Sequence, residues 1–571
     1  MAVISKLRAK RKKPASRRDK AGHHASAADP FAPFQDWHKI DSAEILPEPW
    51  EDKPFTEHQR QAVAQNARLL LDRTAWHARV EAFQTALAAI EDRTVWKAKL
   101  AEFHIRFDRH GFPNGPDKDF SHYRFPCSVS FAGARFNDGN VSFAGARFSS
   151  GKVSFANVAF RNGKVQFDGA EFGDGDVSFD GARFGSGHVR FAGTWFGKGN
   201  VSFKNVHFDD GDVSFERVRF GDGHVLMSEA SFGHSDISFV AAEFGRGNVL
   251  FNNVEFGDGN ALFDNVRFGS GDVDFTETRF GEGNLSFANA IFSDGFLSFS
   301  KAVLVGRNFW FLPDSLHNVD FSAADLDTNK NLYVQGTFER DVSFIRLRVG
   351  GTASFANSVF SKVPDFRDAK FDRPPSVANM FVPRPKLVRR GWRRFKVAAQ
   401  LGDAGKYRKL KAMALAANDH EKDGEFFAYE MLAKRGVEPT GFFPLLFNTL
   451  YHQLGNFGQS YIRPMAWMVA SFIFFVAVYG AIIGPAGGWP HNFLFAIEYS
   501  FRNSVPLFGA LFRTLPTPKN YIGWFDAMFG KLDATNVNME LIGWFGMAQA
   551  FFGGVLLFLL LLALRNKFRL K

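Results

Sequence analysis

The feature that most constrains this chain is a 12-residue period that runs from residue 129 to residue 300. Phenylalanine fills two positions in each period, beginning with Phe131 and Phe136, and 28 of the 29 such positions through Phe299 are phenylalanine. The exception is Met227, which is also large and apolar. Self-similarity at a fixed period is typical of a solenoid, in which each repeat packs on its neighbours. The repeat therefore predicts an elongated rod with a phenylalanine core.

The spacing within one period predicts very short strands. A small or β-branched residue stands two positions before each phenylalanine, as in Val141–Phe143 and Ala146–Phe148. Because side chains alternate across a strand, both members of such a pair share one face. Glycine and asparagine between the pairs suit sharp turns. We expect inward phenylalanines on short strands that are joined at corners.

The interval between successive inward phenylalanines alternates between five and seven residues. A coil with four sides would use 24 residues, and a flat coil would use 12. Two phenylalanines facing each other in a flat coil would overfill its thin core, so we favour 24 residues per coil. At a strand spacing of about 4.8 Å, the repeat would then form about seven coils and a rod of about 34 Å. The five-residue step persists at Phe355–Phe360 and Phe366–Phe371. The solenoid is predicted over residues 125–372.

The five-residue half of the repeat, Phe–x–x–Ala–x–Phe, resembles the pentapeptide-repeat family. This resemblance implies a right-handed β-helix with one short side for each pentapeptide. The expected fold class is therefore mixed: a right-handed β-helix with flanking α-helices, followed by a two-helix transmembrane domain. A stacked rod defines an architecture and does not by itself define a function.

Charge and turn chemistry restrict what the rod can bind. Residues 129–300 contain 22 acidic and 14 basic residues, a net charge of −8. Some pentapeptide-repeat proteins are acidic rods that imitate DNA. The arginines here recur at one repeat position and would weaken the negative electrostatic potential that such a rod needs. The turns GDGD (173–176) and GDGN (257–260) lack the nine-residue consensus of calcium-binding β-rolls. We expect an unknown cytoplasmic protein partner, no nucleic acid and no metal.

The N-terminal part divides into a tail and a helical segment. Nine basic residues and one acidic residue stand in residues 1–20, and residues 1–54 are predicted to be a disordered basic tail and linker. Residues 55–112 carry apolar residues such as Trp76, Val80 and Phe83 at helical spacing. This segment is expected to cap the solenoid or to mediate oligomerisation. The single cysteine, Cys127, excludes a disulfide-stapled scaffold.

Residues 384–438 are predicted to form a helical joint after the solenoid. Seven cations fall within 384–396 around Trp392. They form a candidate membrane-surface patch, for which a solvated helix face is an equal alternative. The four arginines that define this patch are Arg389, Arg390, Arg393 and Arg394. The following residues read as two helices joined at Asn418–Asp419, with Asp419 as an N-cap.

Residues 440–571 are predicted to form a membrane domain. The uncharged stretch 465–484 is about 30 Å long as a helix, which is enough to span a bilayer, and 541–564 gives a second span. Arg463 precedes the first span, and Arg565 and Lys567 follow the second. The positive-inside rule therefore places both termini in the cytoplasm. We expect a multi-pass protein of a bacterial inner membrane whose direct partner is the lipid bilayer.

The connection between the spans contains a candidate re-entrant half-helix at residues 491–509. The candidate pore-loop residues are Ser504, Val505, Pro506, Leu507, Phe508 and Gly509. Glu498 and Arg502, four residues apart on a helix, are expected to pair with each other. Together with GNFGQSYIRPMAW (455–467), this plan resembles bacterial membrane proteins that join pentapeptide repeats to a two-span, ion-channel-like module. The sequence differs from potassium channels because no TVGYG filter follows this half-helix. Two spans cannot enclose a pore alone, so the resemblance implies a homo-oligomer.

The sequence carries no motif for catalysis. It has no phosphate loop, no HExxH and no helix-opening dinucleotide fingerprint. We therefore expect a non-enzyme without a cofactor. The first hypothesis is an oligomeric, channel-like membrane protein with a cytoplasmic sensing or interaction rod. The alternatives are a membrane-tethered scaffold without conduction and an acidic DNA mimic.

Overall fold

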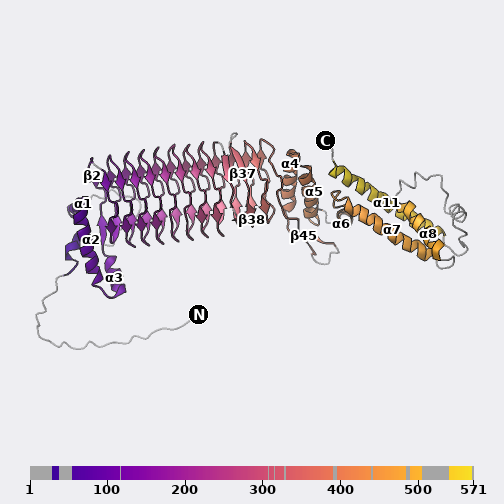
Figure 1. Ribbon diagram of the computed structural model, residues 1–571, viewed down its shortest axis with the longest axis horizontal. Coiled ribbons are helices and arrows are strands. Elements are labelled where there is room, and N and C mark those ends of the chain that lie inside the picture. The colour runs from indigo at the N-terminus through magenta and orange to yellow at the C-terminus, as the bar shows by residue number, and fades with distance from the viewer. Residues whose placement is uncertain are drawn as a thin grey trace, which may run out of the picture.

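The fold is a long β-solenoid with helices at both ends (Figure 1). One set of helices covers its N-terminal end, and a helical joint at the other end leads to a group of long apolar helices. The computed structural model describes residues 29–37, 55–115, 117–306, 308–313, 315–326, 330–389, 395–438, 441–483, 489–504 and 539–568. The predicted tail and linker at 1–54 lie outside these residues except for 29–37.

One coil of the solenoid contains four short strands. A representative coil consists of β5 (Ser128–Ser130), β6 (Arg135–Phe136), β7 (Val141–Ser142) and β8 (Arg147–Phe148). The next strand, β9 (Val153–Ser154), pairs in parallel with β5, and Val129 lies opposite Val153. The coil therefore has 24 residues, which confirms the prediction, and the 12-residue period of the sequence is half a coil.

Stacking of these coils produces four columns of parallel strands. Three columns hold eleven, twelve and eleven strands. The fourth is broken into shorter sheets that are linked in part by single bridges. The first strands of the four columns are β1 (His104–Arg106), β2 (Gly111–Phe112), β3 (Lys118–Asp119) and β4 (Arg124–Phe125). The last are β39 (Val342–Ser343), β43 (Lys370–Phe371), β41 (Ala353–Ser354) and β42 (Val359–Phe360).

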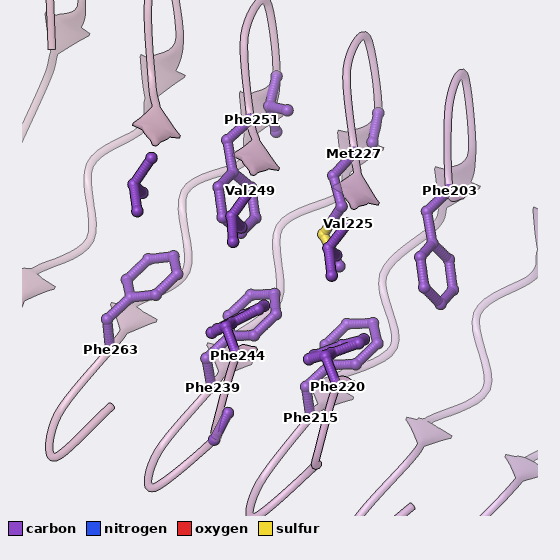
Figure 2. Close-up of a cluster of buried hydrophobic side chains, with 14 of the residues drawn as sticks. Phe203, Phe215, Phe220, Val225, Met227, Phe239, Phe244, Val249, Phe251 and Phe263 are labelled. Atoms are coloured by element: carbon purple, nitrogen blue, oxygen red, sulfur yellow. The ribbon is translucent and has the colours of Figure 1, made fainter. Parts of the chain in front are cut away.

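The core consists of phenylalanine rings stacked along the rod (Figure 2). Phe131 and Phe155, one coil apart, have ring centroids 4.9 Å apart and an interplanar angle of 2°. Phe131 meets Phe143 of the opposite side edge to face, at 5.6 Å and 75°. Both geometries are favourable for aromatic pairs. Met227 is buried at 1% exposure and interrupts one stack between Phe203 and Phe251.

The corners of adjacent coils approach each other too closely for a side chain. A Cβ atom at Gly199 would lie 2.2 Å from the carbonyl oxygen of Gly175, which is one coil earlier. The repeat therefore requires glycine there because of backbone contact between coils. This contact accounts for much of the glycine that accompanies phenylalanine in the sequence.

The N-terminal helices close the first coil. They are η1 (Ala32–Trp37), α1 (Glu57–Leu71), α2 (Arg73–Ala88) and α3 (Arg93–Leu100). Trp76 is fully buried, and its indole Nε1 donates to the carbonyl oxygen of Arg124 at 3.1 Å. Phe83 is also fully buried and stacks edge to face on Phe103. This cap satisfies strand-edge groups and covers the apolar end of the rod.

The solenoid begins at His104, earlier than the predicted start at residue 125. The predicted helical segment 55–112 therefore ends too late, because its last residues form β1 and β2. The first coil does contain the five-residue step, at Phe107–Phe112 and Phe120–Phe125. Eight residues instead of seven separate Phe112 from Phe120, and six instead of seven separate Phe125 from Phe131, so the second half of this coil is displaced by one residue from the 12-residue period.

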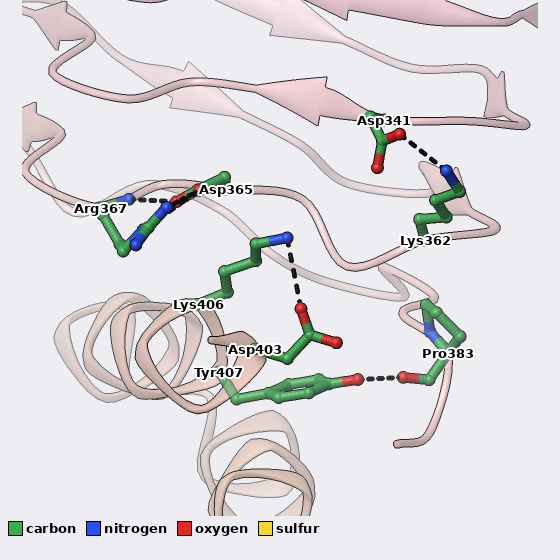
Figure 3. Close-up of polar contacts among 8 residues, drawn as sticks. All are labelled: Asp341, Lys362, Asp365, Arg367, Pro383, Asp403, Lys406 and Tyr407. Carbon is green, nitrogen blue, oxygen red and sulfur yellow. Dashed lines mark hydrogen bonds and ion pairs between the residues drawn. The ribbon is translucent and has the colours of Figure 1, made fainter. Parts of the chain in front are cut away.

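The helical joint covers the C-terminal end of the solenoid (Figure 3). It contains the hairpin β44 (Leu387–Val388) and β45 (Val397–Ala398), and the helices α4 (Asp403–Ala416) and α5 (His420–Lys434). The Tyr407 hydroxyl of α4 donates to the carbonyl oxygen of Pro383, and Lys409 Nζ donates to that of Ala369 at 2.6 Å. Asp419 accepts from the Lys422 amide at 3.0 Å, which confirms it as the N-cap of α5.

Within the residues that the structure describes, four further helices follow the joint. They are α6 (Phe442–Gly455), α7 (Ile462–Ile483), α8 (Trp489–Ser504) and α11 (Met539–Lys567). The helices α7, α8 and α11 lie together at the end of the molecule opposite α1–α3 (Figure 1). Within the described residues, α7 and α11 are long and apolar enough to cross a membrane, and they correspond to the two predicted spans.

Candidate functional site

The candidate site lies where α8 ends between the two long apolar helices. The Ser500 hydroxyl of α8 donates to the carbonyl oxygen of Phe472 at 3.0 Å. Phe472 stands near the middle of α7, which runs from Ile462 to Ile483. On the other side, a Cβ atom at Gly553 would lie 2.4 Å from the carbonyl oxygen of Ser504. Gly553 is the midpoint of α11. The C-terminal end of α8 therefore lies beside the middle of both long helices.

A buried glutamine connects these three helices. Gln549 of α11 accepts a hydrogen bond from the Tyr479 hydroxyl of α7 at 2.8 Å. Its Nε2 lies 2.8 Å from Ser500 Oγ, 3.0 Å from the Ser500 carbonyl oxygen and 2.9 Å from Ser504 Oγ. Gln549, Ser500 and Tyr479 are 0% exposed. Each polar group in this cluster thus has a partner, as buried polar groups require.

Apolar and aromatic residues of the same three helices pack beside the polar cluster. Tyr479, Phe495 and Ile542 belong to a separate apolar core formed by α7, α8 and α11. Tyr479 meets Tyr499 edge to face at 5.0 Å, and Tyr499 stacks on Phe495 at 5.7 Å. The site is therefore a small buried polar cluster inside an apolar bundle. Its geometry places the last turn of α8 in one position relative to α7 and α11.

The structure tests only part of the predicted pore loop. Ser504 is the last residue of α8, and its hydroxyl donates to the Ser500 carbonyl oxygen at 2.7 Å. The other five candidate residues, Val505, Pro506, Leu507, Phe508 and Gly509, lie outside the described residues. Glu498 and Arg502 pair at 3.4 Å, which confirms the predicted interaction between them.

The predicted basic patch is likewise described only in part. Arg389 directly follows β44 and is exposed. Arg390, Arg393 and Arg394 lie outside the described residues. The predicted membrane-facing role of these four residues therefore stays a prediction.

A tight turn connects the helical joint with the apolar helices. Asn456, Phe457 and Gly458, between α6 and α7, have φ angles of 48°, 57° and 78°. Phe457 is 1% exposed and packs in a core with Ala428 and Leu432 of α5. A large aromatic residue with positive φ is conformationally costly, by about 1–2 kcal/mol. The packing of Phe457 on α5 offsets this cost.

The same turn also contacts the C-terminal end of α11. Asn566 Nδ2 donates to the carbonyl oxygen of Gly458 at 3.0 Å. A Cβ atom at Gly458 would lie 3.1 Å from the Leu562 side chain. Residues 456–458 thus touch α5 on one side and α11 on the other. This turn therefore connects the helical joint with the apolar helices.

A buried carboxylate holds the helical joint together. Glu430 of α5 is 3% exposed and pairs with Arg408 at 3.0 Å, with Lys411 at 2.6 Å and with Lys434 at 2.8 Å. Burial by itself would raise the pKa of Glu430, but the hydrogen bonds from the three cations outweigh it and lower the pKa to about 2. The ionised carboxylate therefore stabilises the packing of α4 on α5.

Sequence reasoning missed the partners of Gln549. In the sequence, Gln549 is a strongly polar residue within the apolar stretch 541–564, and nothing there indicates what it contacts. Tyr479 and Ser500 lie 70 and 49 residues away in the chain, so no local spacing relates them to Gln549. A strongly polar residue inside an otherwise apolar span was the one available signal.

Together, these elements define a mixed protein: a β-solenoid flanked by α-helices, with two helices that are long and apolar enough to cross a membrane. Comparisons of the chain with known protein families, with curated proteins and with solved structures found no match.

Proposed function

We propose that this chain is an integral membrane protein in which α7 and α11 span the bilayer and the solenoid is a cytoplasmic interaction or sensing rod. The outer surfaces of both helices support this assignment. They expose large apolar side chains that water would not favour, including Ile473 (61%) on α7 and Trp544 (68%) and Phe551 (76%) on α11. A bilayer, or further copies of the chain, would cover these surfaces.

The positions of the charges support the orientation of the chain. Arg463 lies in the first turn of α7, and Arg565 and Lys567 lie in the last turn of α11. All three are at the end of the helices that faces the joint and the solenoid. The positive-inside rule favours the cytoplasm for this end. The resemblance to pentapeptide-repeat membrane proteins agrees with a bacterial inner membrane.

The position of α8 supports a channel-like role. If α7 and α11 span the bilayer, the last turn of α8 lies near mid-depth, and α8 is a re-entrant half-helix. The C-terminal end of a helix carries a partial negative charge of about half an electron. A helix end at mid-depth is tolerated only next to protein or water. A half-helix that ends at Ser504 would therefore favour a cation at the centre of an oligomer. This position of α8 is the observation that carries the proposal.

The joint supports coupling between the rod and this site. Phe457 packs on α5 and adjoins residues that contact α11. A movement of the helical joint would therefore shift the cytoplasmic ends of α7 and α11. In the proposed function, a partner on the rod biases the membrane helices by this route.

One observation favours a second function, a membrane-tethered scaffold without conduction. Gln549, Ser500 and Tyr479 are fully buried and bonded to one another within one chain. These groups therefore face no water-filled space of their own, and α8 could serve only to pack the bundle.

Subunit number and cation flux together test the two functions. The full chain is reconstituted in nanodiscs for mass measurement and in liposomes for a monovalent-cation flux assay. We expect an oligomer with flux above that of empty liposomes. A monomer without flux would support the scaffold and overturn the channel. A protein that remains in the aqueous fraction without detergent would overturn membrane insertion itself.

A further inference from the structure

Three arginines from separate parts of the chain converge on one stretch of α6. Arg384 follows the solenoid, Arg435 is the C-cap of α5, and Arg463 lies in the first turn of α7. Arg384 Nη2 lies 2.5 Å from His452 Nε2, and Arg463 Nη1 donates to the His452 carbonyl oxygen at 2.8 Å. Arg435 Nε donates to Asn448 Oδ1 at 2.6 Å. All three guanidinium groups therefore lie along one turn of one helix.

These contacts give the three arginines hydrogen-bond acceptors but do not neutralise their positive charges. The acceptors are a histidine ring, a backbone carbonyl and a side-chain amide, all of which are neutral. Within the described part of the chain, none of the three arginines forms an ion pair. The cations around Glu430 provide the contrast, because they share a buried carboxylate. Three cations without a neighbouring carboxylate are typical of a site that binds an anion from outside the protein.

The electrostatic environment of the cluster agrees with this interpretation. Burial, followed by the charges of the three arginines, lowers the pKa of His452 to about 4. His452 is thus neutral at pH 7 and accepts a hydrogen bond through its ring. Arg435 is only 3% exposed, and burial followed by the charge of Arg384 lowers its pKa to about 10. An anion would relieve the repulsion between these groups.

The surroundings of the cluster identify the source of the anion. The outer face of α6 exposes Phe442 (57%), Phe443 (66%) and Phe447 (65%), and α7 begins directly after the turn. An amphipathic helix of this kind lies in the membrane interface with its apolar face among acyl chains. The arginines would then be at the level of lipid headgroups. Arginine is well suited to phosphate because its planar fork donates two hydrogen bonds.

We propose that Arg384 and Arg463, beside the buried charge of Arg435, bind the phosphate group of an anionic phospholipid at the cytoplasmic face of the membrane. This inference rests on the proposed membrane insertion. The bound lipid would link the segment that follows the solenoid with the start of α7. It would thus fasten the rod to the membrane helices at a point separate from Phe457.

Lipid binding by the detergent-purified full chain tests this proposal. Phosphatidylglycerol and phosphatidylcholine are titrated in turn, and bound lipid is measured by native mass spectrometry. We expect phosphatidylglycerol to bind at least about tenfold more tightly than phosphatidylcholine. Arg384→Gln and Arg463→Gln should each abolish most of this preference. Arg565→Gln, which removes an exposed cation at the same membrane level, should retain it.

The other outcomes overturn the proposal in distinguishable ways. A loss of selectivity in Arg565→Gln equal to that in Arg384→Gln would indicate a diffuse charge effect. Displacement of the lipid by millimolar inorganic phosphate would show a site for free phosphate. A chain that floats with phosphatidylcholine vesicles but shows no lipid preference would overturn the lipid site alone. A chain that does not float would overturn both the lipid site and the proposed function. Arg384→Lys, which keeps the charge but loses the fork, should bind weakly with an unchanged melting temperature.

Discussion

Replacing Gln549 with leucine should loosen the apolar helices by a measurable amount. Leucine is similar in size but cannot bond to Tyr479, Ser500 or Ser504, which surround Gln549 at 2.8–3.0 Å. The glutamine amide has two N–H donors, so it makes at most two of its three Nε2 contacts at once, together with one bond from Tyr479. Hydrogen bonds between membrane helices average about 0.6 kcal/mol, so three bonds predict a loss of about 2 kcal/mol.

This loss corresponds to a change of about 30-fold in the unfolding equilibrium. It can be measured by titrating the full chain with sodium dodecyl sulfate in mixed micelles and following tryptophan fluorescence. Gln453→Leu is the matched control, because the Gln453 side chain is exposed on α6. The control should change stability by less than about 0.5 kcal/mol, as surface substitutions usually do. Equal effects of the two variants would refute the role assigned to the buried cluster.

Three further predictions concern the solenoid and the joint. Met227→Phe should complete the stack between Phe203 and Phe251 and stabilise the rod by about 1–2 kcal/mol in urea unfolding; a loss would show that the core is too narrow for a ring there. Ala241→Asn should stabilise the rod by about 0.5–1 kcal/mol, because Ala241 has a φ of 57° and asparagine tolerates this conformation better; an unchanged urea midpoint would contradict this. Glu430→Gln should cost about 3 kcal/mol at pH 7, since the pKa of Glu430 is lowered from 4.5 to about 2 and its stabilisation is present above pH 4.5 and lost as the pH falls toward 2. A difference in urea midpoint that stayed constant between pH 6 and pH 3 would contradict it.

The solenoid could be predicted from sequence because its core is local and repeated. The inward phenylalanines are separated by five and seven residues in alternation, as expected for short strands that are joined at corners. The size of the phenylalanine side chains favoured a coil of 24 residues over a flat coil of 12. The structure shows why this reasoning succeeds. Phe131 contacts Phe155 one coil away and Phe143 half a coil away, so the same few contacts recur along the rod.

The first coil was missed for a physical reason. Its phenylalanines keep the five-residue step, but one extra residue in the corner between Phe112 and Phe120 displaces Phe120 and Phe125 from the 12-residue period. A corner tolerates such an insertion because its side chains face solvent, whereas a strand does not. A strict period therefore underestimates the length of a solenoid. The recurrence of phenylalanine pairs five residues apart indicates the extent of the solenoid more reliably than the 12-residue period.

The candidate sites depend on contacts that the sequence does not reveal. Gln549 could be identified as polar within an apolar stretch, but its partners come from two other helices. In the sequence, Arg384 belongs to the basic run at 384–396, whereas Arg435 and Arg463 precede the first predicted span. Their convergence on His452 depends on the path of the chain through the joint and the turn at Phe457. Neither site has a local motif, so only the fold brings its residues together.

The reversal potential of the reconstituted full chain tests whether α8 ends at mid-depth in an oligomer and favours a cation there. With a tenfold gradient of potassium chloride across a planar bilayer, we expect a current that reverses near the potassium equilibrium potential, about 59 mV from zero. A current that reverses near the chloride potential, or no current from an inserted protein, would contradict it.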